Sequence, residues 1–377
     1  MDYDKIKYWL ALKSIAGIGN VVFSALLDNF GTLPSIFSAS PAELQKISGI
    51  TKKAAAGIAA FKDWNIINKD LAALEKAGIS IVTLQDSLYP PKLLEVYDRP
   101  PFLYVRGTLN KDDIDIAIVG SRLASTYGKY TTERISRELA LRGVTVVSGL
   151  ARGIDSAAHQ GALTARGRTI AVLGTGLDII YPPENKKLFA AIGENGAVVS
   201  EYPLGTPPLA SNFPARNRII SGMSYGVVVV EAGEKSGSLI TARLALEQGR
   251  EVFAVPGAID AAGSRGTNKL IKQGAKLIEN TDDILEEILP QLEKPKITEI
   301  IADSVIDPKA GKINEDLKDI DRQITALLSD SRLHIDELII TTGLPPGDIL
   351  SSLMKLELNG IVDQFPGKLF SLRAVTK

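Results

Sequence analysis

Short apolar runs alternate with amphipathic segments throughout residues 79–290, and this alternation constrains the fold more than any other feature of the sequence. The apolar runs are predicted strands at residues 116–119, 144–147, 169–173, 197–200, 226–230 and 251–255. Segments between them, such as GKYTTERISRELALRG and SLITARLALEQGR, have the spacing of amphipathic helices. Continuous apolar strands joined through helices predict a parallel sheet covered on both faces. The fold class is therefore α/β, with a Rossmann-like, doubly wound core.

A small all-helical domain is predicted before this core, in residues 1–75. Apolar–Gly–apolar turns at 15–19 and 47–50 each open an amphipathic helix. This is the pattern of a helix-hairpin-helix or SAM-like module, in which N–H groups at the helix start can receive a phosphate. An ordinary helical turn, in which glycine supplies a positive φ, remains the alternative.

Two further parts are predicted after the core. Residues 291–315 are polar, contain two prolines and predict a linker. Residues 316–377 predict a winged-helix domain, because three amphipathic helices precede the hairpin segment IVDQFPGKLFSL with its Pro-Gly turn. This last part holds 7 Lys and Arg against 9 Asp and Glu. Because a duplex reader needs a basic face, we expect this domain to contact protein or to keep only a vestigial DNA contact.

The charged residues point to a local anion site in the core. The chain of 377 residues carries 43 Lys and Arg against 44 Asp and Glu, a net charge of -1. Arginines are unevenly placed, since 14 of 17 lie in residues 76–290 and none in residues 1–75. The planar guanidinium suits phosphate better than the point charge of lysine. We therefore expect a confined basic groove on an otherwise balanced surface, with modest affinity for duplex DNA.

Residue content also excludes several functional classes. There is no cysteine and there are only two histidines, so disulfides, thiolate zinc sites and cysteine nucleophiles are absent and histidine-rich metal sites are not expected. His159 has no histidine or cysteine nearby in the sequence and is expected to be structural. The N-terminus has no signal-peptide pattern, and no apolar run approaches the roughly 20 residues of a membrane span. We expect a cytoplasmic protein without metal or cofactor.

The residues that follow the predicted strands carry the chemistry, because doubly wound sheets bind ligands beyond the carboxyl ends of their strands. The first such loop holds Gly120, Ser121 and Arg122, which combine close backbone approach with a hydroxyl and a guanidinium. The second holds Arg152 and leads to Asp155, which is expected to cap the next helix. The third, GTGLDIIYPPEN, lacks the last glycine of a dinucleotide fingerprint, and the sequence has no Walker A loop.

The stretch NFPARNRIISG at residues 212–222 is the most informative of these segments. Phe213 offers an aromatic face to an unpaired base, while Arg216, Asn217 and Arg218 offer phosphate contacts, the usual combination in single-strand binding. Arginines two residues apart cannot both face one way on a helix, so one of them is expected to serve the fold. The loop EAGEKSGS that follows adds small polar residues at a helix N-terminus.

Taken together, GSR, SGLARGIDSAAHQGAL, LGTGLDIIYPPEN, NFPARNRIISGMS, EAGEKSGSLITARLALEQGREVFAVPG and GSRGTNKLI resemble the DNA-processing protein A family, also called DprA or Smf. The resemblance covers roughly residues 80–290, with looser similarity on both flanks. It implies a protein that is not an enzyme. It also implies that the protein binds and protects incoming single-stranded DNA, forms a homodimer and loads the RecA recombinase during natural transformation.

The loops and this resemblance give one candidate DNA-binding set. Its members are Gly120, Ser121, Arg122, Arg152, Lys186, Lys187, Phe213, Arg216, Asn217, Arg218, Lys235, Ser236, Ser238, Arg243 and Asn268. No residue is predicted to be catalytic and none to bind metal.

Two other functions stay open. The core is also similar to nucleotide phosphoribohydrolases, whose PGGxGTxxE loop would fall near EAGEKSGSLITA. This chain lacks the double glycine and has Leu239 or Thr241 where the catalytic glutamate is expected, which argues against a hydrolase. The second alternative is a scaffold whose helical ends dock partners.

Overall fold

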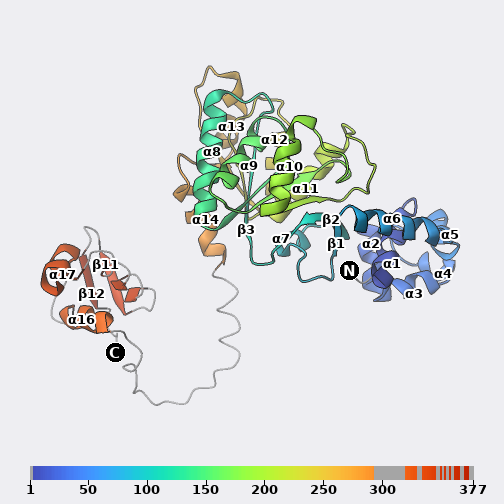
Figure 1. The fold of residues 1–377 in the computed structure, drawn as a ribbon, viewed down its shortest axis with the longest axis horizontal. Helices are drawn as coiled ribbons and strands as arrows, with labels where there is room; N and C mark the ends of the chain where they lie inside the picture. Colours follow the sequence, from blue (N-terminus) through green and yellow to red (C-terminus); the bar gives the residue numbers. More distant parts are fainter. Residues whose placement is uncertain are drawn as a thin grey trace, which may run out of the picture. The chain divides into compact units, whose positions relative to one another are not determined.

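The structure, a computed structural model, describes residues 3–292, 319–328, 333–344, 349, 352–353, 356–357, 361–365 and 369–372. The chain divides into two compact units, Met1–Thr298 and Glu299–Lys377. Figure 1 shows the sheet and its helices in the first unit and the smaller second unit.

A nine-stranded sheet forms the centre of the first unit, with the order β1-β2-β6-β5-β4-β3-β7-β8-β9. Parallel pairing joins all neighbours from β6 to β9 in that order, which confirms the doubly wound core. The parallel strands are β3 (Ile114–Val119), β4 (Val144–Ser148), β5 (Thr169–Leu173), β6 (Gly196–Ser200), β7 (Gly226–Val229), β8 (Glu251–Ala254) and β9 (Lys276–Leu277). Each of the six predicted strands is present, with ends that differ by at most two residues.

Sequence patterns did not predict the antiparallel edge of this sheet. Strand β2 (Phe102–Gly107) pairs antiparallel with β6, and β1 (Ser80–Thr83) pairs antiparallel with β2. The short helix α7 (Pro91–Leu94) lies between them in the chain. Because antiparallel strands need no helical crossover, this edge lacks the strand–helix alternation that marks the rest of the core.

The direction of the chain through the sheet reverses beside β3. The chain moves from β3 through β4 and β5 to β6 on one side, then returns to β7 on the other side of β3 and continues to β8 and β9. The crevice beyond the carboxyl ends of β3 and β7 is therefore a topological switch point, where open α/β sheets bind ligands.

Helices cover both faces of the sheet, as Figure 1 shows. They are α8 (Thr126–Leu141), α9 (Ile154–Thr164), α10 (Lys186–Asn195), α11 (Asn212–Met223), α12 (Ser238–Glu247), α13 (Arg265–Lys272) and α14 (Asp282–Leu292). Strand β3 contributes side chains to the apolar cores on both faces of the sheet. Its Ala117 and Val119 pack with residues of α11 and α12, while Ile116 and Ile118 pack with residues of α8 and α9.

The N-terminal part of this unit is helical, as predicted. Its helices are α1 (Tyr3–Ser14), α2 (Asn20–Phe30), α3 (Leu33–Ser38), α4 (Pro41–Leu44), α5 (Lys52–Ala59) and α6 (Trp64–Lys76). Gly17 and Gly49 in the two hairpins have φ of +92° and +85°, a conformation that favours glycine. The apolar core of these helices continues into β2, β5 and β6 and into α10. The boundary near residue 75 stays a prediction, because this helical part and the sheet form one compact unit.

The second unit contains the elements of a winged helix. They are α16 (Asp319–Leu327), β10 (Leu333–His334), α17 (Ile335–Thr342), β11 (Val362–Phe365) and β12 (Leu369–Leu372), with the three strands in the antiparallel order β10-β12-β11. The third predicted helix is only partly among the described residues, where Ile349, Leu353 and Leu356 are helical and buried. The Pro-Gly turn and residues 293–315 of the predicted linker lie outside the described residues.

Candidate nucleic-acid interface

A pocket of about 790 Å³ lies at the switch point of the sheet. It receives residues from the loops after β3, β4, β5 and β7 and from α11, which follows β6. The lining residues from these segments include Gly120, Ser121, Arg122, Ala151, Asp155, Tyr181, Phe213, Arg216, Asn217, Lys235, Ser236 and Ser238. The sequence prediction that several polar loops meet at one edge of the sheet is therefore confirmed for these loops, whereas none of the lining residues comes from the loop after β8.

Backbone contacts hold the first loops of the pocket together. The N–H of Ser121 donates to the carbonyl of Glu231 at 2.7 Å, and the N–H of Ile154 donates to the carbonyl of Ser121 at 3.1 Å. Gly153 has φ of +74°, and a Cβ there would lie 2.2 Å from the Ser121 carbonyl oxygen. Only glycine fits this close crossing, so the Gly-Ser-Arg turn has a fixed position.

Arg122, Phe213 and Tyr181 form the aromatic part of the pocket. The Cζ atom of Arg122 lies 5.3 Å from the centre of the Phe213 ring, and the Tyr181 ring centre lies 5.6 Å from that of Phe213 with 36° between the planes. Arg122 is exposed, so its guanidinium faces solvent while it contacts an aromatic ring. The three side chains offer stacking faces and a positive charge in one place.

Arg216 lies beneath these side chains and is buried. Its Nη1 donates to the carbonyl of Gly149 at 2.8 Å and to the carbonyl of Val172 in β5. Burial lowers the pKa of Arg216 to about 10 and the charge of Asp155 opposes that shift, so the guanidinium remains charged at neutral pH. Its Nε donates to the side chain of Asn217 at 3.2 Å. Arg216 thus supplies a fixed positive charge below the pocket.

Asp155 serves the loop after β4 rather than the end of helix α9. Its carboxylate accepts from the N–H of Gly149 at 3.1 Å and from the N–H of Ala151 at 3.3 Å. The expectation that Asp155 caps α9 is wrong, because it lies inside the first turn and Gly153 holds the cap position. Burial raises the pKa of Asp155, while Arg216 and the two N–H groups oppose this shift.

The loop after β7 closes another side of the pocket. Lys235 is exposed, and the hydroxyls of Ser236 and Ser238 lie 2.8 Å apart. Helix α12 begins at Ser238, directly after Gly237. The start of this helix therefore borders the pocket, where its N–H groups favour an anion.

Several residues of the predicted set lie elsewhere. Arg152 is exposed, forms an ion pair with Glu184 and lines a small side cavity of about 40 Å³ that also includes Arg122 and Tyr181. Lys186 and Lys187 are exposed at the start of α10 and line neither cavity.

Arg243 and Asn268 also lie outside the pocket lining. Arg243 forms an exposed i, i+4 ion pair with Glu247 at 3.5 Å. Asn268 bonds both backbone groups of Gly257, so its amide fixes the loop after β8.

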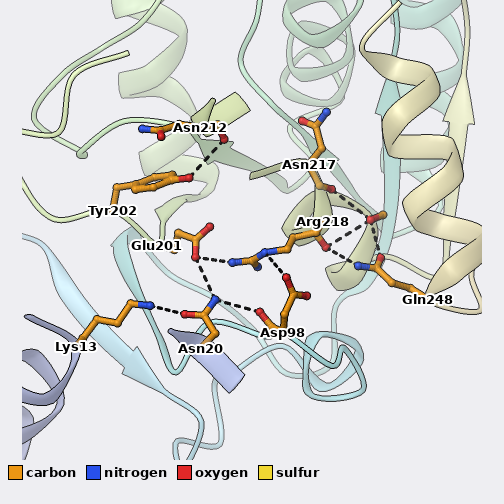
Figure 2. A network of polar contacts seen from close by, with 10 residues as sticks. Lys13, Asn20, Asp98, Glu201, Tyr202, Asn212, Asn217, Arg218 and Gln248 are labelled. Atoms are coloured by element: carbon orange, nitrogen blue, oxygen red, sulfur yellow. Dashed lines mark hydrogen bonds and ion pairs between the residues drawn. The ribbon is translucent and has the colours of Figure 1, made fainter. Parts of the chain in front are cut away.

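Arg218 does not line the pocket but pairs with two acidic residues that also contact the N-terminal helices. Figure 2 shows its guanidinium between Asp98, at 3.0 Å, and Glu201. Asn20, the first residue of α2, donates to the Asp98 carbonyl at 3.1 Å and to Glu201 at 3.4 Å, and Lys13 donates to Asn20. The sequence prediction that one of the two arginines serves the fold is consistent with this placement.

Sequence patterns did not predict Tyr181 as a site residue, because its loop matches no known nucleotide-binding motif. The motif GTGLDIIYPPEN does not fit a dinucleotide fingerprint, and the predicted site included the lysines that follow it, Lys186 and Lys187, but not its tyrosine. The signal was an aromatic residue in a loop that follows a buried strand, next to other ligand-binding loops.

His159 is fully buried in α9 and has a structural partner. Its Nδ1 lies 2.7 Å from the Thr169 hydroxyl, which donates to the Val146 carbonyl. Burial, with a smaller effect from the positive charge of Arg216, lowers the pKa of His159 to about 3. The imidazole is therefore neutral at physiological pH.

In the part of the chain that the structure describes, no group of three or more His, Asp and Glu side chains is placed to hold a metal ion. Among the helices of the described residues, none has the length and apolar character needed to cross a membrane.

The structure defines a Rossmann-like protein with a pocket at the switch point of its sheet, a helical N-terminal part and a winged-helix C-terminal unit. Three family profiles match this chain: DNA recombination-mediator protein A over residues 80–289, a DprA winged helix domain over 308–368, and a SAM-like helix-hairpin-helix tandem over 10–61. The chain belongs to the DNA recombination-mediator protein A family.

Named relatives and solved structures agree with this assignment. The chain is 35% identical to Protein Smf of Synechocystis, over 97% of this chain and 98% of the relative, and 43% identical to Protein Smf of Escherichia coli, over 81% of each. The crystal structure of DNA processing protein A from Streptococcus pneumoniae matches with a TM-score of 0.67 and 38% identity, over 75% of this chain and 98% of that one. A Helicobacter pylori structure, whose title describes a single-stranded DNA binding mode, matches with a TM-score of 0.50 and 34% identity, over 56% and 97%.

Removal of the Arg218 guanidinium is expected to destabilise the first unit. In Arg218→Met the carboxylate of Glu201 stays partly buried without its cation, so the free energy of unfolding falls by about 3–5 kcal/mol. Arg243→Met breaks an exposed ion pair and costs about 0.5 kcal/mol or less. Urea denaturation compares the two variants, and equal losses would contradict the assignment of Arg218 to the fold.

Acid is expected to destabilise the protein through His159. Because the folded-state pKa is about 3, below the ordinary 6.5, the unfolded chain binds a proton that the folded protein excludes. Stability from this residue is complete above the ordinary pKa and falls by up to about 1.4 kcal/mol for each pH unit below it. Denaturation of the wild type and of His159→Asn from pH 7 to pH 5 measures the difference. Parallel pH profiles would contradict the prediction.

Proposed function

We propose that this protein binds single-stranded DNA in the pocket at the switch point of the sheet and acts as a recombination mediator in natural transformation. The observation that carries the proposal is the contact of the exposed Arg122 guanidinium with Phe213, next to Tyr181. Aromatic faces stack on unpaired bases and arginine neutralises phosphates, the combination that proteins use for single strands. The relative from Helicobacter pylori, whose structure title names single-stranded DNA binding, supports the same ligand here.

The lining of the pocket suggests which residues contact the bases of the DNA and which contact its phosphates. An unpaired base stacks against Phe213 and Tyr181, while Arg122, Lys235 and the N–H groups at the start of α12 contact phosphates. Arg216 adds a fixed charge below and keeps Asn217 in place. A base inside a duplex cannot enter such a recess without unpairing, so the pocket favours single strands.

We further propose that the protein acts in the cytoplasm as a homodimer, without catalysis, and loads RecA onto the bound strand. A binding role without catalysis is supported by the small number of carboxylates that line the pocket. Among the described lining residues Asp155 alone is acidic, and its carboxylate accepts two backbone N–H groups rather than facing an open reaction centre. Release of free base from nucleoside monophosphates, measured by chromatography, would overturn the non-enzymatic part of this proposal.

Loss of the Arg122 guanidinium is expected to weaken single-strand binding. Arg122→Ala removes a phosphate contact and the cation beside Phe213, so the Kd for a labelled oligothymidylate rises by about tenfold. The matched control is Arg137→Ala, since Arg137 is also exposed but lies about 17 Å along α8 from its start, at 1.5 Å per residue. Fluorescence anisotropy measures both variants.

The same titration tests the type of ligand. Wild-type affinity for single strands is expected to exceed that for the matching duplex and to fall as salt rises, because counterions are released when phosphates are bound. Equal affinity for both forms of DNA, or binding that does not respond to salt, would contradict the proposal.

Recombinase loading is tested by the lag before RecA begins to hydrolyse ATP on single strands covered by a single-strand binding protein. The wild type is expected to shorten this lag, whereas Arg122→Ala shortens it less at the same concentration because the variant binds the strand more weakly. A wild-type protein that binds the strand but does not change the lag would refute the mediator role and leave the binding role intact.

A further inference from the structure

We infer that a DNA strand leaving the pocket crosses the first turns of α8, where Tyr127 and Tyr130 form a second stacking surface for its bases. This inference rests on the proposed function and adds a site outside the pocket. We call the surface formed by Leu123, Tyr127 and Tyr130 the tyrosine ridge.

The ridge consists of large side chains that the fold leaves in solvent. Leu123 is 91% exposed, Tyr127 62% and Tyr130 67%. The two tyrosines lie at i and i+3, so they share one side of the helix. The opposite side of α8 is its packed face and includes Thr132 and Ser136. In the described part of the chain, neither tyrosine ring has an aromatic, cation or hydrogen-bonding partner.

The ridge continues the wall of the pocket. Leu123 lines the pocket and directly follows Arg122, and Tyr127 comes four residues later in the first turn of α8. The connection is held in place, because the N–H of Leu123 donates to the Ser121 hydroxyl at 3.1 Å and the Ser125 hydroxyl accepts from the N–H of Gly128 at 3.0 Å. A strand that passes Arg122 therefore meets Leu123 and then the tyrosines on a fixed surface.

Charged residues of both signs lie near the ridge. Lys129 is exposed in the same turn of α8 as Tyr127, and the exposed Glu133 lies three residues after Tyr130. The nearby carboxylate of Glu231 is held at the start of the helix, where it accepts from the N–H of Ser125 at 3.1 Å and from its hydroxyl at 2.7 Å. The positive end of α8 offsets part of that negative charge.

Two other sides of the pocket offer no aromatic ring. The side formed by residues 207–210 is exposed but has the sequence Pro-Pro-Leu-Ala, without an aromatic ring or a charge. On the side of Lys235, the neighbouring residue Glu234 is exposed and acidic. A pocket of about 790 Å³ is the size of a small-ligand site and holds only a short piece of strand, so the remainder has to cross one side. The ridge offers two exposed stacking faces that continue the pocket wall beyond Leu123.

The test compares a short and a long oligothymidylate, of about 4 and about 20 nucleotides, on the full-length chain. For Tyr127→Ala/Tyr130→Ala, the Kd for the long strand is expected to rise by about fivefold or more, from the loss of base stacking, with no change for the short strand. Tyr127→Phe/Tyr130→Phe keeps the aromatic faces and is expected to bind both strands like the wild type. The matched control is Tyr97→Ala, because Tyr97 is 80% exposed but lies between α7 and β2.

Each other outcome overturns a different statement. If the wild type does not bind the short strand, the proposed function itself fails. If Arg122→Ala weakens binding but the tyrosine variant binds both strands like the wild type, only the ridge is refuted. A tyrosine variant that changes the molar mass in light scattering, without changing the dependence on strand length, would make the ridge a contact between copies of the chain and would also refute the inference.

Discussion

The buried guanidinium of Arg216 joins the parts of the pocket, and their positions depend on it. A buried charge is costly unless it is hydrogen-bonded, and Arg216 meets this need with the carbonyls of Gly149 and Val172 at the carboxyl ends of β4 and β5. This fixes α11 against the loops that follow those strands, and with α11 the ring of Phe213. The contact also explains Gly149, where a Cβ would lie 2.6 Å from the guanidinium.

Different sides of helix α11 therefore contribute to the pocket and to the network around Arg218. Phe213 and Asn217 face the pocket, whereas Arg218 faces the N-terminal helices, as the network in Figure 2 shows. At the start of α2, which follows one of the two hairpins, the Asn20 side chain donates to Asp98 and Glu201. Helix α11 therefore carries both Phe213 of the pocket and Arg218 of this network. A change in the packing of Arg218 is expected to shift the helix that positions Phe213.

Sequence patterns predicted the core because six of the parallel strands are continuous apolar runs. They predicted which edge of the sheet holds the pocket because that edge follows from strand direction. They did not predict that Arg216 lies at the pocket and Arg218 away from it. The spacing shows that the two side chains point in different directions, but it does not locate the carbonyls that bind Arg216 or the carboxylates that bind Arg218. Tyr181 and the β1–β2 edge were missed for a similar reason. Their placement depends on contacts between segments distant in the sequence, such as the pairing of Tyr104 with Ser200.

The most direct test of the account is the position of the bound strand on the protein. Single-stranded DNA that carries 5-iodouracil can be photo-crosslinked to the full chain, and the attached peptides identified by mass spectrometry. The account predicts crosslinks to the peptides that contain Phe213 and Tyr181, the aromatic residues of the pocket. Crosslinks confined to the N-terminal helices or to the winged-helix unit would contradict the claim that the switch point of the sheet holds the strand.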